Sequence, residues 1–323
     1  MKYRKLGRTG LRVSSLCLGT MNFGAGTEEK EAFYIMDAAL DAGINFFDTA
    51  NNYGFLVGKP GITEEIIGRW FQQGGGRREK TVLATKVHED MFDETDGPNT
   101  TPGLSVYKIR RHLKKSMERL HTDHVEIYYL HHVDRTVEVE EIFGGMTNLQ
   151  ERGLIDYIGV SNFPAWKTVQ AQERFRSKGS FGISVQQETY SLINRSIESE
   201  VLPACSAYGI GIVAYSPLGC GVLSCSAEDT LRRRGNEKEI AKHRRQLEDY
   251  SRLCKDAGIP EGITALAWLL QRTDLTAPII GPRTYQQLED SIKALEIKLP
   301  EDMLKELDRI FPGPGTAPEA YGW

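Results

Sequence analysis

The hydrophobic residues of this chain fall into short runs that alternate with longer segments of mixed apolar and charged residues. Short runs rich in β-branched and aromatic residues predict strands, and apolar positions at helical spacing predict amphipathic helices. Strands that alternate with helices along a chain are typical of a parallel sheet joined by crossover helices. The expected strands are residues 16–20, 45–48, 82–86, 125–131, 155–160, 182–187, 210–215 and 277–281.

The longer segments have the end signals of helices. The expected helices include residues 28–42, 64–72, 105–120, 139–151, 197–208 and 286–295. Gly43, Gly153 and Gly209 follow three of them, at the position where glycine favours a left-handed helix end. Eight strand and helix repeats without a break in composition predict an α/β fold, a single (β/α)8 TIM barrel that forms one domain over residues 1–323.

Three further segments extend this barrel. A short hairpin over residues 3–14 is expected before the first barrel strand. The connections over residues 88–103, after the third strand, and 217–260, after the seventh, are long enough to form lids or binding loops. Residues 311–323 are rich in Pro and Gly, and we expect a flexible tail there, with a flap over the site as the alternative.

Composition narrows the class of protein. Hydrophobic residues make up 40% of the chain and charged residues 26%, which favours a globular protein with a sizeable core. The net charge of −4 argues against a nucleic-acid partner, since such proteins present a basic face. The charged first ten residues and the lack of a long apolar run indicate a cytoplasmic protein without a membrane segment. The five cysteines have neither disulfide nor metal-ligand spacing, so no metal is expected.

Polar, aromatic or glycine residues stand at or just after the carboxyl ends of the expected strands, where core positions would be apolar. They are Asp48, Lys86, His131, Asn162, Gln187, Tyr215 and Gly281. In α/β barrels the carboxyl ends of the strands form the rim on which active sites are built. The sequence therefore predicts a site at this rim.

Four residues of this region, Asp48, Tyr53, Lys86 and His131, are suited to act together on a carbonyl group. A free tyrosine has a pKa of about 10, so it exchanges protons near neutral pH when a cation such as Lys86 favours the phenolate. Asp48 would keep Lys86 charged, and His131 would hydrogen-bond a carbonyl oxygen. Each residue also has a purely structural alternative. Asp48 and Lys86 could form an ordinary buried ion pair, and Tyr53 could be an exposed loop residue. His131 could be a core histidine, and the sequence alone does not decide whether His131 or His132 points inward.

The same residues resemble a known family. The segment Asp48-Thr49-Ala50-Asn51-Asn52-Tyr53-Gly54 resembles the aldo-keto reductase signature D-x-A-x-x-Y-G. Ala84-Thr85-Lys86 and Leu130-His131-His132-Val133-Asp134 resemble the lysine and histidine segments of that family, and the alignment selects His131 over His132. The resemblance continues in order to the eighth strand, through residues 159–163, 187–190, 215–218, 281–283 and 287.

The resemblance implies reduction of a small-molecule carbonyl by NADPH, with Tyr53 as general acid. It implies a cofactor-binding set of Ser161, Asn162, Gln187, Tyr215, Ser216, Leu218, Gly281, Arg283, Gln287 and Asp290. Within this set, Ser161, Asn162 and Gln187 would hold the nicotinamide carboxamide and Tyr215 would stack on the ring. Arg283 would pair with the 2′-phosphate, a contact suited to its planar guanidinium, unless it is simply an exposed arginine.

The sequence departs from the family pattern near the phosphates. Ser291 stands where asparagine is common, and residues 224–226 replace a segment that often carries a lysine. Arg232, Arg233 and Arg234 are candidates for the pyrophosphate contact, although a run of arginines is also typical of a solvated helix face. No G-x-G-x-x-G motif follows a strand, so a Rossmann-type site is not expected.

The substrate is less well defined. Residues 21–24 and 55–62 resemble a bacterial branch of the family that includes sugar and sugar-nucleotide reductases. Candidate walls of a substrate pocket, each of which could equally be a packing residue, are Met21, Phe23, Phe55, Phe92 and Trp323.

Two other functions stay open beside the reductase. One is a cofactor-binding regulatory subunit of low activity, and the other is a barrel aldolase that forms a Schiff base through Lys86. The presence of all four catalytic positions favours the reductase. A homo-oligomer is also left open.

Overall fold

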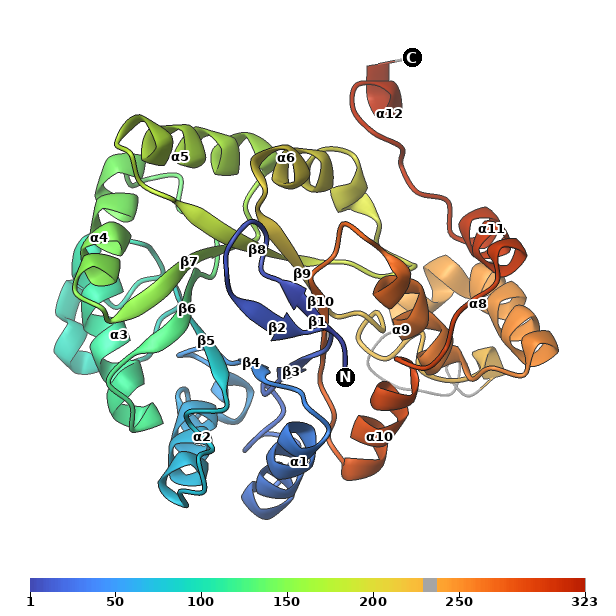
Figure 1. Cartoon of the computed structure of the whole chain (residues 1–323), viewed down its shortest axis with the longest axis horizontal. Helices are drawn as coiled ribbons and strands as arrows, with labels where there is room; N and C mark the ends of the chain where they lie inside the picture. The colour runs from blue at the N-terminus through green and yellow to red at the C-terminus, as the bar shows by residue number, and fades with distance from the viewer. Residues whose placement is uncertain (229–236, 323) are drawn as a thin grey trace.

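The computed structural model of the protein describes residues 1–228 and 237–322. Its centre is a closed barrel of eight parallel strands in the order β10-β3-β4-β5-β6-β7-β8-β9, with helices around the outside (Figure 1). The strands are β3 (Cys17–Gly19), β4 (Phe46–Asp48), β5 (Val82–Val87), β6 (Val125–Leu130), β7 (Ile155–Ser161), β8 (Ile183–Thr189), β9 (Gly211–Tyr215) and β10 (Ala277–Ile280). The predicted (β/α)8 barrel and its eight strands are therefore confirmed.

The six helices predicted from the sequence are present, with differences at their ends. The long helices are α1 (Glu29–Asp41), α2 (Ile62–Gln72), α3 (Val106–Leu120), α4 (Val139–Glu151), α5 (Ala165–Ser177), α6 (Val201–Tyr208), α8 (Glu237–Ala257), α9 (Glu261–Gln271), α10 (Tyr285–Lys293) and α11 (Glu301–Ile310). Shorter turns are η1 (Phe55–Val57), η2 (Glu94–Asn99), η3 (Ser196–Glu198) and α12 (Glu319–Gly322).

The helix expected over residues 197–208 is divided. It begins as the 3-10 turn η3, and the α-helix α6 starts only at Val201. Pro203 explains the break, because a proline lacks the N–H that a helix interior needs and is tolerated only in the first turn. Starting at Val201 places Pro203 in that first turn.

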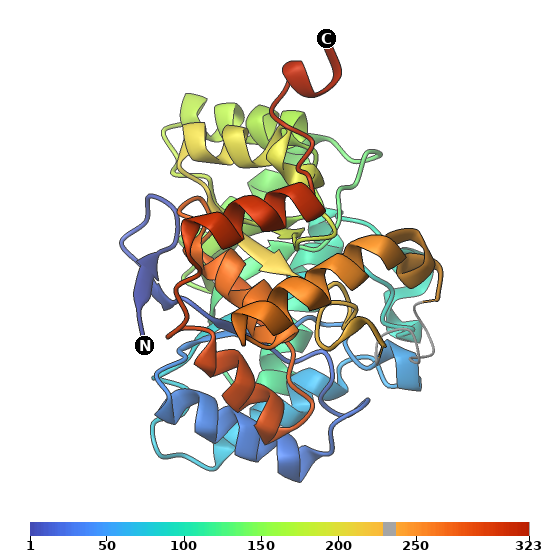
Figure 2. The same ribbon diagram turned by 90° about the vertical axis from the view of Figure 1, so that its right-hand side faces the viewer.

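The second long connection contains a helix that sequence reasoning had not assigned. Helix α8 buries Ile240, Leu247, Tyr250 and Cys254, whose spacing places them on one helical face. It packs beside α9 and α11 on one side of the barrel, as both views show (Figure 2). The first long connection, residues 88–103, contains η2.

The C-terminal segment begins against the body of the protein. Phe311 is buried, with its ring 5.7 Å from that of Tyr250, and the Ala317 N–H donates to the carbonyl of Ser199 at 2.8 Å. Helix α12 then stands apart from the barrel (Figure 1). Within the described residues, no helix combines the length and the apolar character needed to cross a membrane.

Side chains alternate between two hydrophobic layers along each strand. Phe46, Ile127 and Tyr129 belong to the cluster inside the barrel, whereas Phe47 and Tyr128 pack in the larger cluster beneath the helices. This alternation follows from the two-residue period of a strand. It places Asp48, Lys86 and Gln187 on the inner side at the carboxyl ends of their strands.

The predicted N-terminal hairpin is present as the antiparallel strands β1 (Tyr3–Lys5) and β2 (Arg12–Ser14). Leu6 and Val13 are fully buried within the inner cluster, so the hairpin fills one end of the barrel. It lies across the barrel in Figure 1 and at its edge in Figure 2.

Gly7 allows this close approach of the hairpin, and a side chain there should destabilise the fold. Its φ is +58°, and a Cβ atom would lie 2.5 Å from the carbonyl oxygen of Gly209 and 2.6 Å from the nitrogen of Gly211. We expect Gly7→Ala to lower the free energy of unfolding by about 2–4 kcal/mol through overpacking and backbone strain. Gly10→Ala, in the same turn with open space around it, should change it by less than about 0.5 kcal/mol. Equal denaturation midpoints for the two variants would contradict this role of the hairpin.

Candidate active site

The ammonium group of Lys86 is the centre of the polar cluster at the barrel rim. Its Nζ donates to Asp48 Oδ1 at 2.5 Å, to the carbonyl oxygen of Thr49 at 2.8 Å and to the Tyr53 hydroxyl at 3.0 Å. These three bonds use all three donors of a lysine. The side chain of Lys86 is 0% exposed, so no water can replace a lost partner without rearrangement.

Asp48 is held from its other side by Gln187. The Gln187 side-chain amide donates to Asp48 Oδ2 at 2.8 Å, so both carboxylate oxygens of Asp48 have partners. Sequence reasoning assigned Gln187 to the cofactor and missed this bond. The only sign of this bond in the sequence is the alternation of side chains along each strand. This alternation turns both Gln187, near the end of β8, and Asp48, at the end of β4, toward the inside of the barrel.

Burial and the ion pair act against each other in setting the pKa values. For Lys86, burial disfavours the charge, but Asp48 and Tyr53 outweigh it and raise the pKa above the usual value. For Asp48, burial raises the pKa although Lys86 and Gln187 oppose the shift. Lys86 is therefore a protonated donor at neutral pH.

Tyr53 differs from what the sequence suggested. Burial raises its pKa above the usual value of 10, and this effect exceeds the opposite effect of the neighbouring Lys86. We had expected Lys86 to favour the phenolate, and it does so, but desolvation of the phenol dominates. In the free protein the side chain is consequently a neutral phenol, the form that can donate a proton.

The loop that carries Tyr53 is anchored by a buried relay. Asn51 Nδ2 donates to His112 Nδ1 at 3.0 Å, and His112 Nε2 lies 2.8 Å from Asp96 Oδ2. Burial lowers the pKa of His112, so its ring is neutral, accepting at Nδ1 and donating at Nε2. These three residues join the Tyr53 loop to α3 and η2, and sequence reasoning missed them. A histidine on the apolar face of α3 was the available signal.

His131 is the histidine that lies beside Tyr53. Its ring meets the Tyr53 ring edge-on with 6.2 Å between centroids, whereas His132 stacks on the far side of His131 and lies 3.4 Å from Glu89. Burial, helped by the charge of Lys86, lowers the pKa of His131 well below its usual value. Its Nδ1 is buried and has no hydrogen-bond partner in the described part of the chain.

The residues expected at the nicotinamide end form a second polar cluster at the ends of β7 and β9. Asn162 Nδ2 donates to the His131 carbonyl at 2.9 Å and to Ser161 Oγ at 3.1 Å, and the Tyr215 hydroxyl donates to Asn162 Oδ1 at 2.8 Å. Asn162 has a φ of +57°. Ser216 and Leu218 follow Tyr215 in the turn after β9, where Ser216 Oγ lies 3.6 Å from Cys220 Sγ.

The residues expected at the adenosine end lie at the start of α10. The carbonyl of Gly281 accepts from Asn22, and that of Arg283 accepts from Thr27, which ties this segment to the loop after β3. Arg283 is exposed, and its guanidinium pairs with no carboxylate of the described residues. Its backbone N–H donates to Gln287.

Two further expectations, Asp290 near the adenine and three arginines at the pyrophosphate, have less support from the structure. The Asp290 carboxylate accepts from Lys293 at 2.8 Å, so it belongs to a pair on the surface of α10. Arg232, Arg233 and Arg234 lie outside the described residues.

The candidate pocket walls fall into two groups. Phe23 is fully buried in the outer hydrophobic cluster, so its role is packing rather than lining an open pocket. Met21, Phe55 and Phe92 are 44%, 46% and 73% exposed on the loops after β3, β4 and β5, which are neighbouring strands. Trp323 lies outside the described residues.

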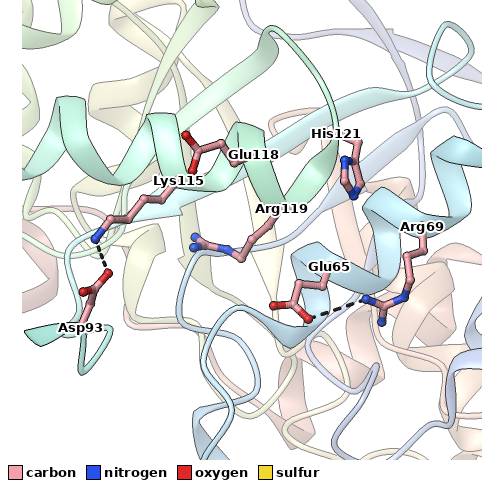
Figure 3. Close-up of a pocket in the computed structure, with 7 residues that line it drawn as sticks. All are labelled: Glu65, Arg69, Asp93, Lys115, Glu118, Arg119 and His121. Atoms are coloured by element: carbon pink, nitrogen blue, oxygen red, sulfur yellow. Dashed lines mark hydrogen bonds and ion pairs between the residues drawn. The ribbon is translucent and has the colours of Figure 1, made fainter. Parts of the chain in front are cut away.

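A separate hollow lies between α2 and α3 (Figure 3). Its charged residues are matched, since Lys115 pairs with Asp93, Arg69 with Glu65, and Arg119 with Glu64. These pairs leave no excess of one charge to recognise a ligand, and none of the rim residues described above lines the hollow.

A buried aspartate and lysine beside a partly buried tyrosine and a histidine, on the rim of a (β/α)8 barrel, define a barrel reductase of the aldo-keto type. The chain belongs to the aldo/keto reductase family, whose family model matches residues 15–311. The resemblance inferred from the motifs is thereby confirmed.

Three relatives illustrate the range of this family. A Bacillus subtilis protein named uncharacterized oxidoreductase YrpG is 55% identical over 328 residues and covers 100% of both chains. A protein of Oryza sativa subsp. japonica named probable voltage-gated potassium channel subunit beta is 31% identical, over 99% of this chain and 100% of its own. An aryl-alcohol dehydrogenase (NADP(+)) of Phanerodontia chrysosporium is 29% identical, over 94% of this chain and 84% of its own. Together with the family match, the relatives named as an oxidoreductase and a dehydrogenase support an oxidoreductase.

The buried pair makes a stability prediction that does not depend on function. Lys86→Met leaves the Asp48 carboxylate buried without its cation, which should lower the free energy of unfolding by about 3–5 kcal/mol. In the double variant Asp48→Asn, Lys86→Met no charge is left unpaired, so at least half of that loss should be recovered. Urea denaturation at pH 7.5 measures both. A double variant that is no more stable than Lys86→Met would show that the unpaired charge is not the cause.

Proposed function

We propose that the protein reduces an aldehyde or ketone to an alcohol with NADPH, and that Tyr53 is the general acid. The observation that carries this proposal is the chain of contacts from the Tyr53 hydroxyl through Lys86 Nζ, 3.0 Å away, to Asp48. His131 on the adjoining side completes a place for a carbonyl oxygen. The proposal includes action in the cytoplasm, which suits the buried thiols of Cys17, Cys205 and Cys254.

The residues present fit a nicotinamide cofactor. Bound NADPH would supply the hydride. Ser161, Asn162 and Gln187 have side-chain amide or hydroxyl groups that suit a carboxamide, and the half-buried Tyr215 offers a ring face at the same rim. At the other end, the guanidinium of Arg283 is exposed and pairs with no carboxylate of residues 1–228 and 237–322, so it suits a 2′-phosphate, and one relative carries NADP(+) in its name. Gly281, with Ser216, Leu218, Gln287 and Asp290, stays in the proposed set on the family resemblance alone.

The proposed proton transfer follows from the protonation state of each side chain. Tyr53, a neutral phenol, donates its proton to the carbonyl oxygen as negative charge develops there. The resulting phenolate is stabilised by Lys86 Nζ, whose own charge is maintained by Asp48. His131 is neutral, so it can donate one N–H to the same oxygen and fix the direction of the carbonyl. Lys86 therefore makes the loss of this proton easier, because it lowers the pKa of Tyr53 against the effect of burial.

The substrate class is proposed at two levels. A small-molecule carbonyl follows from the family, and a sugar or sugar-nucleotide carbonyl is the narrower proposal, supported by the resemblance of residues 21–24 and 55–62 to that branch. The exposed apolar side chains of Met21, Phe55 and Phe92 would suit an apolar or ring-shaped substrate. A screen of aldehydes, ketoses, sugar-nucleotide ketones and aryl aldehydes with NADPH, and with NADH in parallel, addresses substrate and cofactor together.

A cofactor-binding regulatory role is the second candidate, because one relative is named as a potassium channel subunit. Slow turnover on every carbonyl of the panel, together with tight NADPH binding, would favour this role over the reductase. The aldolase alternative has less support. A Schiff-base lysine must lose its proton, whereas Lys86 is fully hydrogen-bonded and has a raised pKa.

Replacing the Tyr53 hydroxyl tests the proposed acid. Tyr53→Phe removes the proton donor and leaves the ring, so we expect kcat to fall by about 10²–10⁴-fold while the Kd for NADPH changes by less than about two-fold. Tyr107→Phe, at a half-exposed position on α3, should leave both unchanged. Steady-state kinetics with the best carbonyl of the screen gives kcat, and fluorescence titration gives the Kd. Full turnover by Tyr53→Phe would rule Tyr53 out as the acid.

A further inference from the structure

A second buried polar network lies on the outer side of the barrel wall, behind the proposed nicotinamide site. Successive residues of β8 point to opposite faces of the sheet, so Gln187 points inward while Gln186 and Glu188 point outward. Gln186 Oε1 accepts from Thr168 of α5 at 2.9 Å and from Cys205 of α6 at 3.4 Å. The network therefore fills the space between β8 and the two helices that cover it.

Glu188 is the charged member of this network. It is 7% exposed, and its Oε1 accepts from the Phe163 N–H at 3.0 Å and from Gln186 Nε2 at 2.8 Å. No lysine or arginine of the described chain forms an ion pair with it. A buried carboxylate without a cation is costly, so its presence calls for a role beyond packing.

The network holds the backbone on both sides of Phe163. Gln186 Nε2 donates to the Phe163 carbonyl at 2.7 Å, while Glu188 accepts from the Phe163 N–H. The preceding residue, Asn162, donates its own N–H to the Gln187 carbonyl at 3.2 Å. Asn162 has a φ of +57°, a left-handed conformation that asparagine adopts more readily than most residues. Glu188 and Gln186 hold the backbone of the residue that follows it.

The orientation of the Asn162 side chain depends on this backbone. Its amide joins three strand ends through Ser161, the His131 carbonyl and the Tyr215 hydroxyl. A small rotation of the 162–163 peptide would break these bonds together. The outer network thus controls the residue that links the proposed nicotinamide site to His131.

We propose that Glu188 is a positioning residue for the cofactor site, whose carboxylate holds the 162–163 backbone and keeps Asn162 aimed at the nicotinamide end of NADPH. This proposal rests on the proposed function, because it requires NADPH to bind at that rim.

The charge on Glu188 changes within the range of neutral pH. Burial raises its pKa to about 7. The titratable groups that face it are Tyr215 on β9 and Cys205 on α6, and burial raises the pKa of each to about 12, so both stay neutral when Glu188 titrates. A carboxylate accepts an N–H bond more strongly than a carboxylic acid does. The hold on Phe163 is therefore strongest above pH 7 and weakens below it.

The test compares NADPH binding by the wild-type protein and by Glu188→Gln at pH 5.5 and pH 8.5. Glutamine keeps the shape and the acceptor oxygen but has no charge. We expect the ratio of the two Kd values, variant over wild type, to be about one at pH 5.5 and about five at pH 8.5. Titration of the 2′-phosphate affects both proteins equally, so it cancels in the ratio.

A matched control and a second readout separate positioning from mere folding. Glu126→Gln alters a partly buried carboxylate near the start of β6, paired with Arg78, and should give a ratio of about one at both pH values. The raised pKa of Glu188 means that the folded protein holds this proton more tightly than the unfolded chain. Ionisation therefore costs stability as the pH rises from about 4.5 to 7, and the melting temperature of Glu188→Gln should exceed that of wild type by more at pH 8.5 than at pH 5.5.

Two results would overturn the proposal, and they differ in what else they affect. A Kd ratio of one at both pH values, with NADPH bound by the wild type, would remove the positioning role and leave the proposed function intact. Failure of the wild-type protein to bind NADPH at any pH would overturn the proposed function and this inference with it.

Discussion

The ion pair between Lys86 and Asp48 is enclosed by the barrel, and the arrangement of the whole rim depends on keeping it satisfied. Removing two charges from water costs several kcal/mol for each, and their attraction offsets that cost only when the remaining donors and acceptors also have partners. Here Lys86 donates its other two hydrogen bonds to Thr49 and Tyr53, and Gln187 donates a hydrogen bond to the second carboxylate oxygen of Asp48. The same bonds that stabilise the pair therefore fix the position of the Tyr53 hydroxyl. Structure and proposed chemistry share one set of contacts.

Support for this rim comes from outside the barrel wall as well as from within it. The relay of Asn51, His112 and Asp96 holds the loop that carries Tyr53, and the network of Gln186 and Glu188 holds the turn that carries Asn162. Both networks are buried, but the Asp96 carboxylate also pairs with Arg111 and Lys115, whereas no lysine or arginine of the described residues pairs with Glu188. Residues that never touch a substrate can in this way determine how precisely those that do are placed.

The sequence was sufficient for the barrel, because each strand and helix has its own local pattern, and for the family, because its motifs are contiguous. Contacts between residues far apart in the sequence could not be predicted from such local patterns. The bond from Gln187 to Asp48 joins residues 139 positions apart, and the burial of Phe23 depends on where α2 packs. The net pKa shift of Tyr53 required knowing both its burial and its distance to Lys86, since the two effects have opposite signs. Helix α8 was missed because the long connection was judged by its length rather than by its apolar spacing.

The central claim is that burial, rather than the neighbouring lysine, decides the protonation of Tyr53 in the free protein. Ultraviolet difference titration of wild type against Tyr53→Phe reports the ionisation of this single phenol. We expect less than half of Tyr53 to be ionised at pH 10, where a free tyrosine is half ionised, because burial raises its pKa. A Tyr53 that is half ionised at or below pH 9 would contradict this expectation, because Lys86 would then outweigh burial in setting the pKa of the phenol.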